Sequence, residues 1–316
     1  MKNRILSLKK QRNALILAHN YQPLAVQDIA DHVGDSLQLA RIASDVNGHD
    51  MVIFAGVKFM AEMASVLADD TPVYIPDPEA LCPLASYCSA ERVRKAKEHH
   101  PGAPAVVYVN TTAETKSECD IICTSSNAVD VVESLRTAKV LFGPDVNLAR
   151  YTRTQTDTEI VDIAEDGHCY VHQKFDVKEI QRLKEEYPNA TLLVHPECPP
   201  DVQDVADIVG STGKMAEYVA QSDDEAFIIA TEVGLVDQLR NNHPNKVIIA
   251  ANENAICRDM KKTSLEKILH ILEEQPAENL VTVPKDMRGK VRLVLERMNR
   301  VGLKESPVSQ VPSATH

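Results

Sequence analysis

Three of the seven cysteines are spaced almost evenly along this chain of 316 residues. Cys82, Cys169 and Cys257 are 87 and 88 residues apart. Three thiolates that meet in one place can bind zinc or an iron–sulfur cluster. A cluster held by three cysteines rather than four would leave one iron open to water or substrate, where it could polarise a carboxylate or hydroxyl as a Lewis acid. A lone cysteine is more often a small buried apolar side chain, so the interpretation depends on the three acting together.

Other polar residues repeat on the same period. Three apolar runs each close on a polar residue, namely His19, Tyr108 and His195. Two positions further on stand Tyr21, Asn110 and Glu197. Side chains two residues apart in an extended strand point the same way, so each pair is predicted to face one cavity. Together with His172, these residues would supply its proton donors and acceptors.

Small hydroxyl residues form a further set, at the predicted beginnings of three helices. They are Ser36, Ser125 and Thr212, separated by 89 and 87 residues. Hydroxyl residues are common helix caps whatever the function of the protein. However, free backbone amides and the helix dipole also favour anions at these points. Their register with the cysteines favours three anion sites on one cavity, suited to a substrate with several carboxylates or a phosphate.

The elements that must position these residues also repeat. Each copy contains three apolar runs typical of buried strands, with helical segments between them, and its third strand leads into one of the three cysteines. Strands alternating with helices predict parallel sheets covered by helices, and ligands bind beyond the carboxyl ends of such strands. The sequence therefore predicts an α/β fold with three repeats around a pseudo-threefold axis. The predicted boundaries are 1–84, 85–172 and 173–260 for the repeats, 261–304 for a closing helix, strand and helix on repeat 1, and 305–316 for a disordered tail.

Composition limits the class of partner. The chain has 34 Lys and Arg against 46 Asp and Glu, a net charge of −12, which disfavours nucleic acid and anionic membranes and favours a small-molecule substrate. No apolar run approaches the roughly 18 residues of a membrane span, and the first 21 residues lack the pattern of a secretory signal. We therefore expect a cytoplasmic protein with reduced cysteines. The remaining cysteines lack threefold partners. Cys88, Cys119 and Cys123 are interpreted as core or incidental, whereas Cys198, which follows Glu197, is expected near the cavity without an assigned role.

The chain resembles the quinolinate synthase family of de novo NAD biosynthesis. The matching stretches are "AHNYQ", "VGDSLQLAR", "YVNTTAETK", "CTSSNA", "CYVHQKF", "VHPEC", "GSTGKM", "ATEVGL" and "ENAICRDMKK", between residues 14 and 265. The resemblance implies three pseudo-symmetric α/β/α sandwich domains with small parallel sheets around a central cavity. It also implies a [4Fe–4S] cluster on Cys82, Cys169 and Cys257, and condensation of iminoaspartate (iminosuccinate) with dihydroxyacetone phosphate to quinolinate, phosphate and water.

The resemblance also implies roles for individual residues. Substrate binding would fall to His19, Ser36, Tyr108, Asn110, Ser125, His195, Glu197 and Thr212. Proton transfer is assigned to Tyr21, His172 and Glu197. The pathway adds the hypothesis of a transient L-aspartate oxidase or dehydrogenase partner that delivers iminoaspartate.

Two other functions are compatible with three convergent thiolates. One is a zinc hydrolase with three thiolate ligands, which would be colourless. The other is an iron–sulfur redox sensor, which would lose its cluster reversibly and would not need hydroxyls at three helix beginnings.

Overall fold

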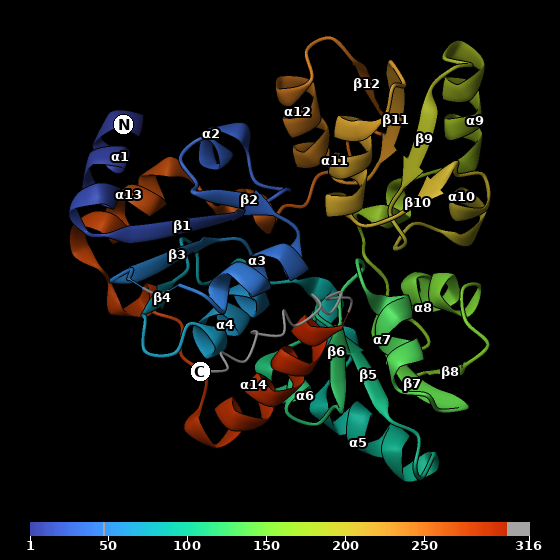
Figure 1. The fold of residues 1–316 in the computed structure, drawn as a ribbon, viewed down its shortest axis with the longest axis horizontal. Coiled ribbons are helices and arrows are strands. Elements are labelled where there is room, and N and C mark those ends of the chain that lie inside the picture. The colour runs from blue at the N-terminus through green and yellow to red at the C-terminus, as the bar shows by residue number, and fades with distance from the viewer. Residues whose placement is uncertain (47, 302–316) are drawn as a thin grey trace, which may run out of the picture.

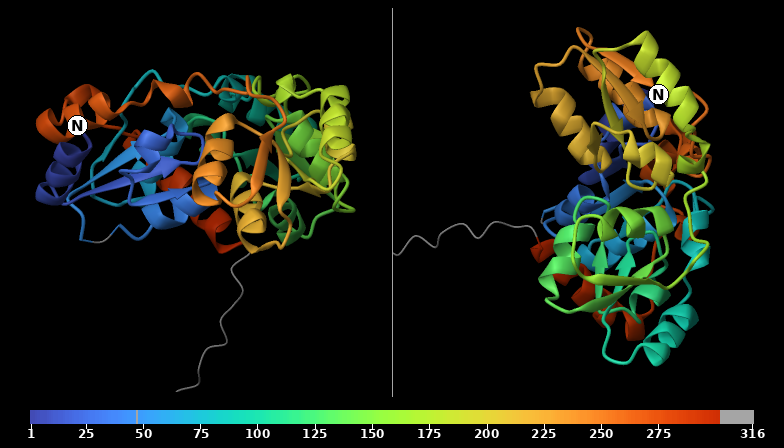
Figure 2. Two further views of the ribbon diagram at one scale, coloured as in Figure 1. Left: turned by 90° about the horizontal axis from the view of Figure 1, so that it is seen from above. Right: turned by 90° about the vertical axis from the view of Figure 1, so that its right-hand side faces the viewer.

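The structure is a computed structural model that describes residues 1–46 and 48–301. The tail predicted at 305–316 lies outside these residues. Three parallel four-stranded sheets form three lobes (Figures 1 and 2), and their strand orders are β2-β1-β3-β4, β6-β5-β7-β8 and β10-β9-β11-β12. Each sheet thus has the same order of strands, with the first strand of the repeat in an inner position. The predicted α/β class with three related sheets is confirmed.

The first two repeats share one succession of elements. Repeat 1 contains α1 (Lys2–Gln11), β1 (Ala14–His19), α2 (Leu24–Gln27), β2 (His32–Gly34), α3 (Ser36–Ala43), β3 (Met51–Ala55), α4 (Lys58–Leu67), β4 (Val73–Tyr74) and η1 (Pro83–Tyr87). Repeat 2 contains α5 (Ala90–His99), β5 (Ala105–Tyr108), α6 (Ala113–Lys116), β6 (Ile121–Cys123), α7 (Ala128–Ser134), β7 (Lys139–Gly143), α8 (Val146–Arg153), β8 (Glu159–Asp162) and η2 (His172–Lys174).

The third repeat follows the same plan, and a closing segment completes the described chain. Repeat 3 contains α9 (Val177–Glu186), β9 (Thr191–Val194), α10 (Pro200–Asp204), β10 (Ile208–Val209), α11 (Thr212–Gln221), β11 (Ala226–Ala230), α12 (Val233–Asn242), β12 (Val247–Ala250) and η3 (Met260–Lys262). The closing segment contains α13 (Leu265–Glu274), η4 (Ala277–Asn279) and α14 (Lys285–Arg300).

The inner strands are buried because helices cover both faces of each sheet. All six residues of β1 are buried, as are all five of β3. Strands buried on both faces appear in the sequence as continuous apolar runs, which is why β1, β5 and β9 were predictable. The prediction of three strands in each repeat was incomplete, because β2, β6 and β10 add a fourth. These edge strands are only two or three residues long, too short to leave a periodic signal.

The predicted strand in the closing segment is not formed. The stretch 279–284 makes only an isolated antiparallel bridge, between Tyr74 and Leu280. The Val281 N–H donates to the Val73 carbonyl, so the segment covers the edge of β4, but Pro284 begins the turn into α14 and ends the pairing. α13 packs on α1, whereas α14 packs on α3 and α4 of repeat 1 and on α6 and β6 of repeat 2 (Figure 1). α14 thus joins two repeats.

Burial shows which repeats share a core. One hydrophobic cluster combines residues of repeats 1 and 2 with α14, while repeat 3 has two clusters of its own. Within the described part of the chain, no helix is both long and apolar enough to cross a membrane.

Candidate active site

The three repeats surround one cavity at the carboxyl ends of their strands. It encloses about 730 Å³ of space, part of it open to solvent. Twelve of the predicted site residues line it, namely His19, Tyr21, Ser36, Cys82, Tyr108, Asn110, Ser125, Cys169, His195, Glu197, Thr212 and Cys257. The remaining one, His172, is buried behind the wall and contacts Glu197. The structure therefore brings all of the predicted residues together.

The three cysteine loops are built on the same backbone frame. In each repeat, the backbone N–H of the first residue of one helix (α4, α8 or α12) donates to the carbonyl oxygen two residues before the cysteine. The three hydrogen bonds run from Lys58 to Ala80, from Val146 to Gly167 and from Val233 to Ala255. Each cysteine then leads into a short 3₁₀ segment. A backbone N–H three residues further along approaches each sulfur, from Ala85, His172 and Met260. Backbone donors aimed at sulfur are typical of metal-bound thiolates.

Burial keeps these three sulfurs protonated unless a cation replaces the proton. Burial raises the pKa of Cys82 to about 12, raises that of Cys169 well above the usual range and raises that of Cys257 as well. All seven cysteines of the chain are free. Three half-buried thiols on one cavity, each approached by a backbone N–H group, form a donor set that fits a metal centre.

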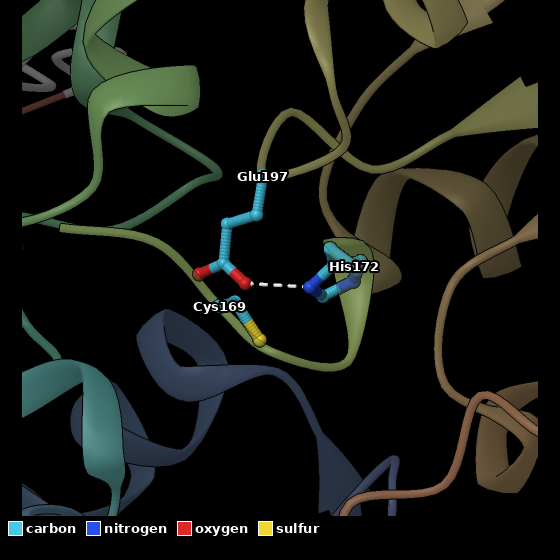
Figure 3. Close-up of side chains that lie close together, drawn as sticks. All are labelled: Cys169, His172 and Glu197. Atoms are coloured by element: carbon cyan, nitrogen blue, oxygen red, sulfur yellow. Dashed lines mark ion pairs between the residues drawn. The ribbon is translucent and has the colours of Figure 1, made fainter. Parts of the chain in front are cut away.

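A second set of possible metal ligands lies beside the cavity. Among the described residues, Cys169, His172 and Glu197 have ligand atoms that all lie within 4.8 Å of one another (Figure 3). Thiolate, imidazole and carboxylate are all ligands of zinc, so this set could hold a single zinc ion.

A chain of polar contacts runs from the cavity into the protein. The hydroxyls of Tyr21 and Thr231 are 2.7 Å apart, and Thr231 Oγ1 lies 3.0 Å from Nε2 of His172. On the other side of the ring, Nδ1 of His172 lies 2.8 Å from Oε2 of Glu197 (Figure 3). The hydroxyl of Tyr108 donates to Oε1 of Glu197 at 2.6 Å. Two phenols facing the cavity are thus connected through a hydroxyl, an imidazole and a carboxylate.

The electrostatics of this chain favour neutral phenols and an ionised carboxylate. Burial raises the pKa of Tyr21 and Tyr108 well above 10, and the nearby Glu197 charge adds to the rise. Burial alone would raise the pKa of Glu197, but His172, His195 and the Tyr108 hydroxyl outweigh it and lower this pKa to about 2. At neutral pH the phenols are therefore protonated and donate hydrogen bonds, and Glu197 is ionised and accepts them.

Two histidines on equivalent strands are held in the same way. The N–H of Tyr21 donates to Nδ1 of His19 at 3.1 Å, and that of Glu197 to Nδ1 of His195 at 3.3 Å. Burial lowers the pKa of His19 to about 4 and that of His195 to about 3. Each ring is neutral, and because Nδ1 accepts, its proton resides on Nε2. Both histidines are N–H donors suited to substrate oxygens.

The helix beginnings differ from the simple cap interpretation. Ser36 and Thr212 are the first residues of α3 and α11, whereas the caps are Asp35 and Ser211. Ser125 precedes α7 by three residues. The hydroxyls of Ser126, at 2.6 Å, and Ser211, at 3.2 Å, both donate to Asp35 Oδ2. Asp35 thus connects all three helix beginnings, and Ser36, Ser125 and Thr212 line the cavity.

The other cysteines lie away from this cavity. Cys88, Cys119, Cys123 and Cys198 are buried and do not line it. Cys198 follows Glu197 in the chain, but its sulfur points to the Ala230 carbonyl, 3.4 Å away. The burial of Cys88, Cys119 and Cys123 agrees with their interpretation as core residues, whereas Cys198, expected near the cavity, does not line it.

Sequence reasoning missed several residues of the site. Thr231 connects Tyr21 to His172, Asp35 connects the helix beginnings, and Glu232 and Lys261 form an ion pair beside Tyr21. A signal existed for one pair only, since Thr231 and Glu232 follow the buried strand 226–230 directly. The other contacts join distant parts of the chain and leave no local pattern.

Comparison with known proteins gives a consistent result. The family model described as quinolinate synthetase A protein matches residues 3–300. The quinolinate synthase of Methanothermobacter thermautotrophicus is 50% identical over 297 residues, covering 94% of this chain and 97% of that protein. The enzyme of Pyrococcus furiosus is 46% identical (94% and 97% coverage), and that of Thermotoga maritima is 44% identical (94% and 98%).

Proposed function

Because the chain belongs to the quinolinate synthase family of enzymes in NAD biosynthesis, we propose that it condenses iminoaspartate with dihydroxyacetone phosphate. Atoms balance when each quinolinate formed is accompanied by one phosphate and two molecules of water. The observation that carries the proposal is the cavity in which three half-buried cysteines, three helix beginnings and a chain of proton carriers meet. These are the groups that a dehydrating condensation of polyanionic substrates needs.

The helix beginnings bind the anionic groups of the substrates. Iminoaspartate carries two carboxylates, and its partner carries a phosphate. Ser36, Ser125 and Thr212 offer hydroxyls at the cavity wall, beside backbone amides at the positive ends of helices. The Nε2–H groups of His19 and His195 add neutral donors for carboxylate or carbonyl oxygens.

The chain from Tyr21 to Glu197 moves protons. Forming the ring requires removal of protons from carbon and their delivery to departing hydroxyl groups. The Tyr21 phenol gives a proton to a departing oxygen, and it recovers one through Thr231 from His172. The ionised Glu197 carboxylate, 2.8 Å from Nδ1 of His172, balances the positive charge of the imidazolium that supplies this proton and becomes neutral on giving it up. Tyr108, which donates to the other oxygen of Glu197, orients that carboxylate and faces the substrate.

Cys82, Cys169 and Cys257 would hold a [4Fe–4S] cluster. When bound, this cluster supplies a Lewis acid, an iron without a protein ligand that polarises a carboxylate or hydroxyl of the substrate. The three half-buried thiols on one cavity and their backbone N–H partners support this assignment. The Asn110 amide, whose Nδ2 lies 3.7 Å from the Cys82 sulfur, adds a side-chain donor.

A zinc enzyme is the second candidate, favoured by one observation. Cys169, His172 and Glu197 could bind a single zinc ion. Such an ion would occupy the proton-carrying residues themselves. Metal analysis separates the candidates, because zinc leaves the protein colourless whereas iron with acid-labile sulfide gives a broad visible band.

The test is quinolinate formation by protein purified without oxygen. We expect product from iminoaspartate and dihydroxyacetone phosphate, and loss of product together with iron and colour after brief exposure to air. Protein that carries iron and sulfide but forms no quinolinate would refute the proposed activity. Because iminoaspartate is unstable, we also propose delivery by an L-aspartate oxidase or dehydrogenase. A coupled assay with a competing trap tests this, since a trap that stops all product would exclude delivery by contact.

A further inference from the structure

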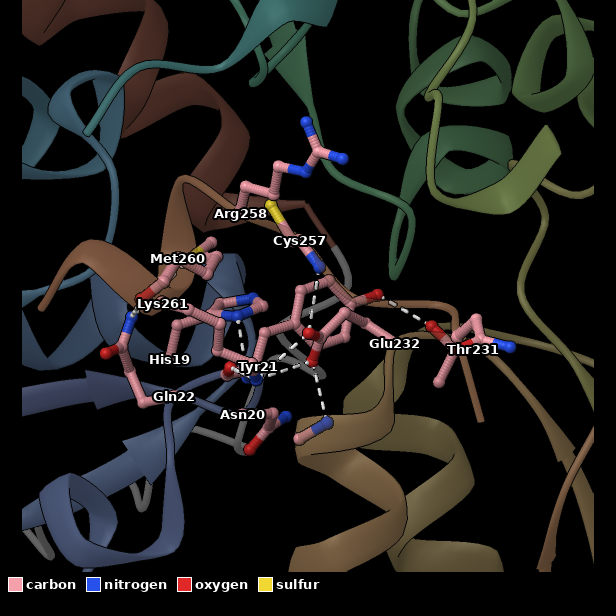
Figure 4. Close-up of polar contacts among 12 residues, drawn as sticks. His19, Asn20, Tyr21, Gln22, Thr231, Glu232, Cys257, Arg258, Met260 and Lys261 are labelled. Carbon is pink, nitrogen blue, oxygen red and sulfur yellow. Dashed lines mark hydrogen bonds and ion pairs between the residues drawn. The ribbon is translucent and has the colours of Figure 1, made fainter. Parts of the chain in front are cut away.

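A buried carboxylate beside the Cys257 loop has more partners than a helix cap needs. Glu232 is fully buried and caps α12. Its Oε1 accepts the N–H of Cys257 at 3.0 Å and lies 2.9 Å from Nζ of Lys261 (Figure 4). Its Oε2 accepts the N–H of Gly234 at 2.7 Å and lies 3.1 Å from the same Nζ. One side chain therefore fixes the Cys257 backbone, a helix beginning and a lysine.

The lysine extends this group of contacts into repeat 1. Besides its ion pair with Glu232, Nζ of Lys261 donates a short hydrogen bond to the carbonyl oxygen of Tyr21 (Figure 4). Tyr21 belongs to the loop after β1, more than 200 residues away in the chain. The route from the Cys257 amide to the Tyr21 backbone thus passes through two side chains.

Close packing keeps the Tyr21 loop against repeat 3. A Cβ atom at Gly234 would lie 2.7 Å from both the carbonyl carbon and the oxygen of Tyr21, so the absence of a side chain allows the approach. The next residue, Gln22, donates through Nε2 to the carbonyl of Met260 at 2.9 Å. The loop is therefore held between α12 and the segment that follows Cys257.

The other repeats show that a cysteine loop forms without such a pair. The positions equivalent to Glu232 are Asp145 in repeat 2 and Val57 in repeat 1, each capping the corresponding helix. Among residues 1–46 and 48–301, no lysine or arginine forms an ion pair with Asp145, and Val57 has no charge. Since the same backbone frame recurs in all three loops, the ion pair of Glu232 and Lys261 serves something specific to repeat 3. What is specific there is the contact with Tyr21.

We propose that Glu232 and Lys261 are positioning residues that couple the metal-binding Cys257 loop to Tyr21. When the loop is ordered by its metal, the pair holds the Tyr21 backbone where its phenol reaches Thr231. When the loop lacks metal, the pair and the Tyr21 loop loosen together. This inference rests on the proposed function for its catalytic consequence, but the coupling itself is a property of the fold.

Hydrogen exchange tests the coupling without an activity assay. In the wild-type chain we expect cluster loading to slow amide exchange in residues 19–22 at least tenfold relative to cluster-free protein. In Lys261→Met the slowing should disappear, while iron and sulfide per chain stay at the wild-type level. Lys246→Met is the matched control. Like Lys261, Lys246 donates to backbone carbonyl oxygens, here those of Val219 and Ser222, but it lies at the opposite end of the repeat 3 sheet. It should keep the slowing.

Kinetics provide a second readout. Lys261→Met should lower kcat at least tenfold with KM within twofold of wild type, and Lys261→Arg should recover much of the loss. Glu232→Ala should also lose iron, because the Cys257 N–H loses its acceptor. Equal slowing of exchange in wild type and Lys261→Met, or loss of iron in proportion to activity in Lys261→Met, would overturn the coupling. Slowed exchange in a wild-type chain that makes no quinolinate would refute the proposed function alone.

Discussion

The Cys82 and Cys257 loops share a backbone frame but are held by different chemistry. The sulfur of Cys82 is approached by the Asn110 amide, and Asn110 lies between two carbonyls that accept hydrogen bonds from the buried Lys116. The backbone of Cys257 is held by Glu232, whose charge is paired with Lys261. One lysine is paired with a carboxylate and the other bonds backbone carbonyls. The repeat therefore conserves geometry, while its electrostatics differ from copy to copy.

The largest expected effect tests whether the two loops act as one site. Cys82→Ala and Cys257→Ala should each abolish bound iron and quinolinate formation, because a cluster needs both thiolates despite their different surroundings. Iron and sulfide analysis with a turnover assay measures this. Full iron content in either variant would break the comparison, since it would show that the two cysteines do not bind the same metal centre.

The next largest effect is the loss of turnover expected from a substitution of Glu197, which contacts both Tyr108 and His172. Glu197→Gln should keep the iron and lower kcat by roughly 10²–10³-fold, the usual contribution of a positioned proton carrier. The substitution removes the acceptor next to His172 but leaves an oxygen for Tyr108. Loss of iron along with turnover would contradict the assigned role and make Glu197 a metal ligand.

Lys116, the buried lysine that bonds backbone carbonyls near Cys82, predicts that the stability of the protein responds to alkaline pH. Burial lowers the pKa of Lys116 to about 8, with Glu62 opposing the shift, so between pH 8 and 10.5 the unfolded chain binds the proton that the folded chain has lost. Unfolding free energy then rises with pH, by at most about 3 kcal/mol for this group. The unfolding free energies of wild type and Lys116→Met should be measured at pH 7.5 and at pH 9.5. The wild-type value minus the Lys116→Met value should be larger at pH 9.5 than at pH 7.5. A pH-independent difference would mean that the amine stays charged.

The smallest effect is expected at a cysteine outside both loops. Cys119→Ala should leave iron content and turnover unchanged and cost about 1 kcal/mol of unfolding free energy, because Cys119 is a small buried side chain. Denaturant unfolding and metal analysis check this together. A colourless variant would show that Cys119 is needed for metal binding, and that the spacing of 87 and 88 residues did not identify the metal ligands correctly.

The repeated features were predictable because repetition itself is a signal. The inner strands, the three cysteines and the polar residues at strand ends stand on one period, and a period can be found without knowing any contact. The pairs His19 with Tyr21 and His195 with Glu197 were expected from strand alternation, but the strands end at His19 and Val194 and a turn follows each. It is in these turns that the N–H of the second residue reaches Nδ1 of the first.

The features that break the symmetry were not predictable. Asp35 accepts hydrogen bonds from the hydroxyls of Ser126 and Ser211, which belong to the two other repeats. Lys261 donates to the Tyr21 carbonyl, 240 positions away in the chain. Such contacts depend on how the lobes are arranged, which no local pattern encodes. The edge strands β2, β6 and β10 were missed for a related reason, since strands of two or three residues exist only through pairing with their neighbours.

The even spacing of the three cysteines also bears on when the proposed cluster could be inserted. A metal site built from neighbouring cysteines is complete as soon as a short segment leaves the ribosome. Here each repeat contributes one thiol, so a nascent chain shorter than 257 residues has at most two of the three. Insertion of a cluster that needs all three would therefore follow synthesis of residue 257, and a product truncated before that residue would lack a ligand.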